Sequence, residues 1–330
     1  MNESERHFGR TNDGWTIALH RRRASWGTSA QPPILLCHGL GANRFNLDAP
    51  GPRSIARWLA NEGFDVWVIE LRGAGLSSRP SSKNQLQWNW TFDDYVNHDI
   101  PTALDVIERV TGHRKVHWLG HSLGGMVAYA FVINHGNHRL QSIATVGSPS
   151  FSRLGNDVFD RIAGFRKLVG LVRRLPYERS GYLLVPTVPI FKETLGWLFG
   201  HPRNLESRTL RQLLTRLPSD LPTSLIMQLG DWYVDGGFTD SSGQKSYSKA
   251  LATIEAPTLL IVGNKDFLTP PADIQYVYDA LSSSEKKLVV LSRANGCRYD
   301  YGHIDPILGR YAQDEVWPLI KGWFEAHTSP

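Results

Sequence analysis

The chain contains few cysteines and no long hydrophobic run. Only two cysteines occur among 330 residues, Cys37 in an apolar segment and Cys297 in a glycine-flanked loop, which argues against a disulfide framework. Nowhere do about 18 apolar residues follow one another, so the sequence predicts no membrane-spanning helix. The N-terminal residues Met-Asn-Glu-Ser-Glu-Arg-His lack the apolar segment of a secretory leader. We therefore expect a soluble, cytoplasmic protein with reduced thiols.

Motifs for nucleic acids, metals and dinucleotides are also missing. The net charge is +5, but no zinc-finger spacing or ribonucleoprotein motif accompanies it, so we expect no nucleic-acid partner. His113, His117 and His121 are spaced four apart, yet the last two bracket an expected strand rather than one helix face. The pair Gly73 and Gly75 lacks the third glycine of a dinucleotide fingerprint. We expect neither a metal nor a cofactor.

Short apolar segments alternate with stretches of helical periodicity, as in parallel strands joined by crossover helices. The composition, 41% hydrophobic and 20% charged, is that of a globular enzyme. After polar hairpin strands within residues 6–23, the expected strands are 34–37, 64–69, 115–119, 142–146, 258–262 and 287–291. The expected helices include 54–61, 92–110, with Pro101 opening a new turn, and a closing helix over 311–324.

Between residues 150 and 248 the strand signal disappears and helical periodicity takes over. This predicts a helical cap inserted between two parts of one core, residues 1–149 and 249–330. Helices are expected over 158–172, over 205–217 and after Asp220, with Pro222 in the first turn of the last. We expect the cap to roof a ligand site at the carboxyl end of the sheet. The side chains expected to line an apolar pocket there are Phe191, Trp197, Leu198 and Trp232.

Gly120-His121-Ser122-Leu123-Gly124 lies between an expected strand and an apolar helix of small residues. Glycines two before and two after the serine permit a turn tight enough to raise the Ser122 hydroxyl above the sheet. A serine that merely caps a helix would not need both glycines. The pattern predicts that Ser122 is a nucleophile.

Backbone amides near Ser122 are candidates for an oxyanion hole. His38-Gly39-Leu40-Gly41 follows an earlier expected strand, and Leu123 follows the serine at a helix N-terminus. We expect the N–H groups of Leu40 and Leu123 to stabilise the oxyanion. The alternative is that His38 and the glycines only shape a turn.

An acid and a base follow the last two expected strands in the order that a Ser, Asp, His triad requires. Asp266 comes directly after the strand 258–262, and His303 lies between the strand 287–291 and the closing helix. Among the twelve histidines only His303 and His327 follow both the serine and this acid, and His327 lies beyond the closing helix. Asp240 is the alternative acid, because another loop could reach the histidine. Asp305 is too near His303 to be preferred.

These motifs resemble the α/β-hydrolases, and within them the branch of the gastric and lysosomal acid lipases. The similar stretches are His38-Gly39-Leu40, the run 47–68, the tryptophan-rich run 88–94 leading to Asp99-Ile100-Pro101, the turn at Ser122, and His303-Ile304-Asp305 with Gly309. The resemblance implies an α/β-hydrolase fold, with a mostly parallel eight-stranded sheet, helices on both faces and a helical cap. It also implies esterase or lipase activity toward acyl esters without a cofactor.

The complete triad and the apolar cap predict a serine hydrolase that cleaves hydrophobic carboxylic esters through an acyl-enzyme on Ser122. The expected partner is a small-molecule or lipid-like ester substrate. Transient contact of the protein with a lipid surface is compatible with this expectation. Two alternatives stay open. The same triad would serve acyl transfer or the cleavage of thioesters, lactones or amides, and a non-catalytic ligand receptor could use the same scaffold.

Overall fold

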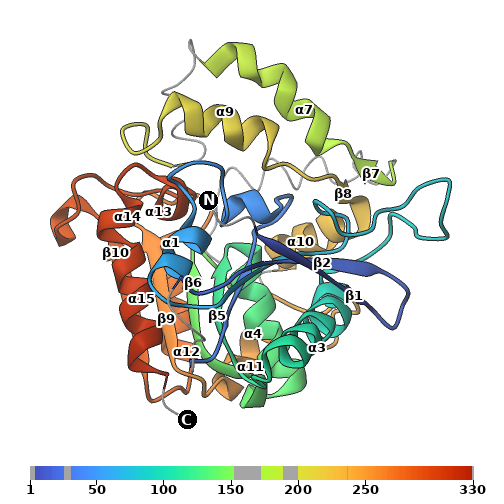
Figure 1. The fold of residues 1–330 in the computed structure, drawn as a ribbon, viewed down its shortest axis with the longest axis horizontal. Coiled ribbons are helices and arrows are strands. Elements are labelled where there is room, and N and C mark those ends of the chain that lie inside the picture. The colour runs from blue at the N-terminus through green and yellow to red at the C-terminus, as the bar shows by residue number, and fades with distance from the viewer. Residues whose placement is uncertain (1–3, 26–30, 152–171, 189–199, 236, 329–330) are drawn as a thin grey trace.

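The computed structural model describes residues 4–25, 31–151, 172–188, 200–235 and 237–328. An eight-stranded sheet runs through its centre, in the order β1-β2-β4-β3-β5-β6-β9-β10 (Figure 1). The strands are β1 Glu5–Arg10, β2 Thr16–Arg22, β3 Ile34–Cys37, β4 Val66–Glu70, β5 Val116–His121, β6 Leu140–Val146, β9 Thr258–Gly263 and β10 Lys286–Leu291.

The sheet is parallel from β4 to β10, and β2 alone runs in the opposite direction, antiparallel to both β1 and β4. All residues of β3, β4, β5 and β9 are buried, as expected for strands covered on both faces. Each strand expected from the sequence is present, with ends shifted by no more than two residues. The predicted fold class, a mostly parallel eight-stranded α/β sheet, is confirmed.

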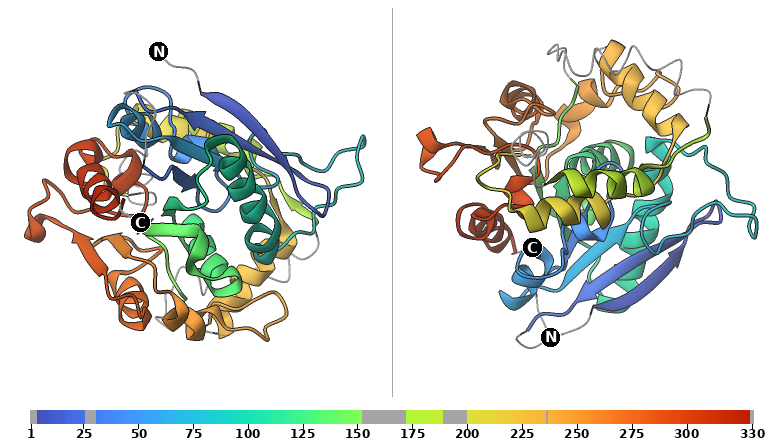
Figure 2. Two further views of the ribbon diagram at one scale, coloured as in Figure 1. Left: turned by 60° about the horizontal axis from the view of Figure 1, so that its bottom comes forward. Right: turned by 90° about the horizontal axis from the view of Figure 1, so that it is seen from above.

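Helices cover both faces of the sheet, as Figure 2 shows. On one face α1 (Ile55–Asn61) and α15 (Trp317–Ala326) pack in the same hydrophobic cluster. On the other face lie α3 (Ile100–Thr111), α4 (Leu123–His135) and α12 (Pro271–Ala280). The short helices are η1 Arg44–Asn46, α2 Phe92–Asp94, η2 Tyr95–Asp99, η3 Asn137–Arg139, α11 Tyr247–Ala250, η5 Leu251–Thr253, η6 Arg293–Asn295, α13 Asp305–Leu308 and α14 Ala312–Glu315.

Proline residues lie in the first turns of two core helices, α3 and α15. Pro101 lies in the first turn of α3, directly after the π-helical turn η2, which agrees with the expected fresh turn. The expected closing helix is divided into α14 and α15 at Val316. Pro318 follows in the first turn of α15, and because it has no amide hydrogen it cannot continue the hydrogen bonding of α14.

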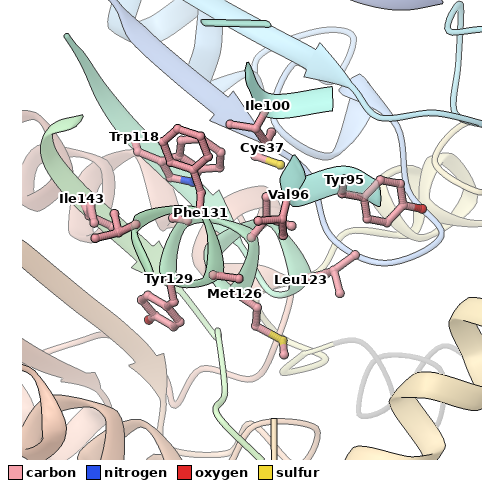
Figure 3. Close-up of a cluster of buried hydrophobic side chains, with 14 of the residues drawn as sticks. Cys37, Tyr95, Val96, Ile100, Trp118, Leu123, Met126, Tyr129, Phe131 and Ile143 are labelled. Carbon is pink, nitrogen blue, oxygen red and sulfur yellow. The ribbon is translucent and has the colours of Figure 1, made fainter. Parts of the chain in front are cut away.

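Helix α4 lies in the centre of the larger hydrophobic cluster and is buried on all sides from Leu123 to Val132. Phe131 of this helix and Trp118 of β5 belong to the same cluster, part of which Figure 3 shows. A helix without a polar face is typical of a protein interior. The N-terminus of α4, where Ser122 lies, is therefore held by core packing.

The described part of the predicted cap lies above the carboxyl ends of the strands in Figure 1. It contains β7 Arg174–Leu175, α7 Tyr177–Leu184, η4 Val185–Thr187, α9 Ser207–Thr215, β8 Leu221–Pro222 and α10 Thr223–Asp235. The helices α9 and α10 match two expected ones, but Pro222 pairs in β8 and precedes α10 instead of lying in its first turn. The expected helix over 158–172 falls outside the described residues apart from its last residue, and the domain limits at 150 and 248 remain predictions.

Candidate active site

The ends of the central strands gather the predicted catalytic residues at one edge of the sheet. Gly39 follows β3, Ser122 follows β5, Asp266 follows β9 and His303 lies in the loop after β10. Because the carboxyl ends of parallel strands share an edge, residues distant in sequence meet there. Ser122, His303 and the Gly39–Ala42 turn line one cavity of about 260 Å³.

Ser122 has a left-handed backbone, with φ 53° and ψ −121°. Only Phe151 shares a positive φ among the described residues other than glycine, and such conformations cost energy that the surroundings must offset. A Cβ on Gly120 would lie 2.4 Å from the Gly125 nitrogen, and one on Gly124 would lie 2.1 Å from the Cys37 oxygen. Both flanking glycines are therefore required, as the motif predicted.

Asp266 and His303 form a buried pair. The Nδ1–H of His303 donates to Oδ2 of Asp266 at 2.8 Å, and the residues are 6% and 3% exposed. Asp240, the alternative acid, lies elsewhere, in a turn where it accepts from the Lys245 amide and the Ser242 hydroxyl. The structure brings Asp266, and not Asp240, to the histidine.

Two further residues enclose this pair. The Thr269 hydroxyl donates to Oδ2 of Asp266 at 2.5 Å and lies 3.2 Å from Nδ1 of His303. Gly147, after β6, has φ +58°, and a Cβ there would lie 3.1 Å from both the Asp266 carboxylate and the His303 ring. Neither residue was singled out from the sequence. The sequence did hold one signal for Thr269, which follows Asp266 by three residues. An aspartate side chain often accepts hydrogen bonds from backbone amides two or three residues further along the chain.

Ser122 and His303 share the cavity but are not hydrogen-bonded to each other in this structure. Catalytic hydrogen bonds are often long before substrate binds. His121, which precedes the serine, instead contacts the histidine loop. Its Nε2 lies 3.0 Å from the His303 carbonyl oxygen, and its Nδ1 lies 3.0 Å from Oδ1 of Asn46. Burial lowers the pKa of His121 to about 3.

The turn after β3 directs one predicted oxyanion donor. The Nδ1–H of His38 donates to the Gly39 carbonyl at 2.9 Å, while its Nε2 accepts from the Leu71 amide. Burial lowers the pKa of His38, which favours the neutral ring that these two bonds require. Because a trans peptide directs its C=O and N–H oppositely, this bond turns the Leu40 amide away from His38. His38 thus shapes the turn and orients the peptide.

The two predicted oxyanion amides are free of hydrogen bonds within the described part of the chain. Leu40 and Leu123 both line the cavity. The neighbouring amide of Gly39 is different, because it donates to Oδ1 of Asn46 at 3.0 Å. Asn46 was not anticipated from the sequence, since its loop has no recognisable pattern.

Apolar side chains from the core and the predicted cap complete the cavity. The core contributes Leu40, Leu123, Met126, Leu268 and Ile304, and the region from 149 to 229 contributes Pro149, Phe151, Tyr177, Leu213, Leu217 and Leu229. No Lys, Arg, Asp or Glu is among the described residues that line it. The site therefore suits an uncharged, apolar group.

The residues expected to line the pocket have a different outcome. Trp232 is 1% exposed and packs against Phe92 and Phe238 at ring distances of 5.0 and 4.8 Å. Trp232 does not line the described cavity. Phe151, whose ring centroid lies 5.7 Å from that of Trp232, lines it instead. Trp232 thus has a packing position, which corrects the expectation of direct contact. Phe191, Trp197 and Leu198 lie outside the described residues.

Asp305 joins the histidine loop to the predicted cap. Its carboxylate is fully buried and accepts from the Gly302 amide, the His201 amide and Nδ2 of Asn204 at 2.8, 3.2 and 2.8 Å. Burial raises the pKa of Asp305 to about 7. Asp305 therefore supports the loop that carries His303, although it does not pair with the histidine.

Known proteins that are similar to this chain share the α/β-hydrolase fold. Residues 32–183 match the family described as alpha/beta hydrolase fold. Lipase member N of Mus musculus is 33% identical over an alignment of 361 positions, which covers 96% of this chain and 86% of that protein. The chain belongs to the α/β-hydrolase family. Triacylglycerol lipase 2 of Arabidopsis thaliana is 24% identical, covering 97% of this chain and 84% of that protein.

The human gastric triacylglycerol lipase is 32% identical over a shorter stretch, 38% of this chain and 33% of that protein. Among solved structures, an esterase from Thermogutta terrifontis has a TM-score of 0.62 at 18% identity, with coverage of 98% and 100%. The resemblance to lipases is confirmed, and this α/β-hydrolase is an ester-hydrolysing serine hydrolase. Every helix within the described ranges is too short or too polar to cross a membrane. The cytoplasmic location remains a prediction.

Proposed function

We propose that this α/β-hydrolase cleaves uncharged, hydrophobic carboxylic esters through an acyl-enzyme on Ser122. The observation that carries the proposal is the buried Asp266–His303 pair, whose histidine borders the same cavity as a serine on a strained, glycine-flanked turn. Lipase relatives support lipid-like esters as the substrate class. The apolar cavity lining supports the same choice.

In the proposed mechanism His303 accepts the Ser122 proton at Nε2 as the hydroxyl oxygen attacks the ester carbonyl. Asp266 holds the proton on Nδ1 of His303, which leaves Nε2 free to act as base. The amides of Leu40 and Leu123 donate to the oxyanion of the tetrahedral intermediate. His303 then protonates the leaving alcohol, and a water activated by the same histidine releases the acid from Ser122.

The test combines covalent labelling with an ester panel. A fluorophosphonate should add once per chain, and peptide mass spectrometry should locate it on Ser122. Wild type should turn over p-nitrophenyl esters with graded acyl chains, whereas Ser122→Ala should lose about 10⁴-fold or more in kcat. Labelling of another residue, or a Ser122→Ala variant with more than a tenth of the activity, would contradict the proposal.

A further inference from the structure

Thr269 lies at the centre of the hydrogen bonds that hold the Asp266–His303 pair. Its hydroxyl oxygen is within hydrogen-bond distance of both partners, 2.5 Å from Oδ2 of Asp266 and 3.2 Å from Nδ1 of His303. Thr269 is 3% exposed, so bulk water has little access to this position. The contact links three side chains from two loops.

The Asp266 carboxylate receives four donors. Its Oδ1 accepts from the amides of Leu268 and Thr269 at 3.0 and 2.9 Å. Its Oδ2 accepts from the Thr269 hydroxyl and from Nδ1–H of His303. A carboxylate has about four lone-pair sites, so all are occupied and the group cannot rotate without breaking a bond. The hydroxyl is the only one of these donors that a substitution can remove while leaving the backbone and both partners in place.

The hydroxyl also restricts the histidine. Because its hydrogen is given to Asp266, its oxygen presents a lone pair toward Nδ1–H of His303. Two acceptors then face Nδ1, which favours the tautomer that leaves Nε2 unprotonated. Gly147 also lies against this pair, and a Cβ there would come within 3.1 Å of both partners.

We propose that Thr269 is a positioning residue for catalysis, whose hydroxyl fixes the orientation of the Asp266 carboxylate and the tautomer of His303. The inference rests on the proposed function, in which this pair activates Ser122. It predicts that the hydroxyl affects kcat and not substrate binding, although Thr269 also borders the cavity.

Thr269→Val replaces the hydroxyl by a methyl group of similar size and should lower kcat for p-nitrophenyl butyrate about tenfold or more, with KM within about twofold. Thr269→Ser retains the hydroxyl and should stay within about threefold of wild type. Thr258→Val is the matched control, because Thr258 is buried at the other end of β9 and its hydroxyl bonds only the Ala256 carbonyl among the residues that the structure describes. It should lose stability without losing kcat.

A double variant separates positioning from substrate contact. In an Asp266→Asn background Thr269→Val should cost less than about threefold, because residues that act as a unit are not additive. A rise confined to KM, full additivity, or a Thr269→Val enzyme with more than half of the wild-type kcat would overturn the inference. If Asp266→Asn itself leaves activity intact, the proposed function fails instead. If Asp266→Asn loses activity but Thr269→Val leaves the wild-type kcat unchanged, the positioning role of Thr269 is rejected and the proposed function stands.

Discussion

The core side and the cap side of the cavity are built differently. On the core side the backbone is fixed by close contacts, as at Gly124, and by directed bonds, as between His38 and the Gly39 carbonyl. On the cap side Leu213, Leu217 and Leu229 contribute hydrocarbon surface alone. Hydrogen bonds require a narrow range of distances and angles, whereas apolar contacts tolerate the replacement of one apolar side chain by another of similar volume. The core side thus suits the reaction itself, and the cap side suits the choice of acyl group.

The largest expected effect tests the core side. Asp266→Asn should lower kcat about 10⁴-fold, because an amide can hold His303 in the wrong tautomer. Asp240→Asn is the matched control, since within the described ranges the Asp240 carboxylate accepts only from residues of its own turn. It should retain most of the activity. Stopped-flow or steady-state kinetics on one ester measure both, and a reversed ranking would move the acid to the other loop.

A smaller but still large effect is expected where a glycine cannot carry a side chain. Gly124→Ala would place a Cβ 2.1 Å from the Cys37 oxygen, so β3 and α4 must separate and displace both oxyanion amides. We expect about a 100-fold loss of kcat together with a lower free energy of unfolding. Gly237→Ala, whose Cβ would meet nothing within 4 Å, should change neither. If the two variants have equal kcat and equal free energies of unfolding, the backbone of the core side is not restricted as proposed.

The elements of the core side were predictable because backbone geometry restricts the residues there. The turn at Ser122 needs both glycines, and the strand order brings Asp266 and His303 to the serine, so motif and chain order sufficed. Asn46, Gly147 and Thr269 were not predictable in this way. Their roles depend on contacts between separate loops, such as the 3.0 Å bond from the Gly39 amide to Asn46, which no local pattern specifies.

The cap side was predicted from periodicity alone, which gives helices but not their contacts. The helix predicted after Asp220 is present as α10, and the signal for it is an apolar stripe at helical spacing, formed by Leu221, Leu225, Leu229 and Trp232. The same stripe could not tell that Leu229 borders the cavity while Trp232 packs beneath Phe151. Rotation and tilt of a helix are set by its partners in space.

The buried carboxylate at the junction of the two regions predicts a pH dependence of stability. The pKa of Asp305 is raised from 3.8 to about 7 in the folded chain by burial, so between these pH values the folded state binds more protons than the unfolded state. The contribution of Asp305 to stability is therefore complete below about pH 4 and is lost as pH rises through 7. Asp305→Asn should flatten this decline in urea unfolding measured from pH 4 to 8.

A matched control for that slope is Asp300→Asn in the same loop. The pKa of Asp300 is lowered, because hydrogen bonds from the Arg293 amide and the Asn264 side chain outweigh the effect of its slight burial. Asp300→Asn should leave the decline of stability between pH 4 and 8 unchanged or make it slightly steeper, whereas Asp305→Asn should flatten it. An unchanged slope in Asp305→Asn would show that its carboxylate ionises as in the unfolded chain.

The smallest expected effect tests whether the cap side selects the acyl chain. Leu213 and Leu210 lie three residues apart on α9 and are 4% and 0% exposed, but only Leu213 lines the described cavity. Truncating either to alanine should cost similar stability. Leu213→Ala should also lower kcat/KM for an octanoyl ester about fivefold relative to an acetyl ester, since each buried methylene contributes about 0.8 kcal/mol. Leu210→Ala should leave that ratio unchanged. Because the ratio compares two substrates on one enzyme, a general loss of folded protein cancels, and only contact with the acyl chain can shift it. Equal ratios in both variants would place the acyl chain against another part of the cavity wall.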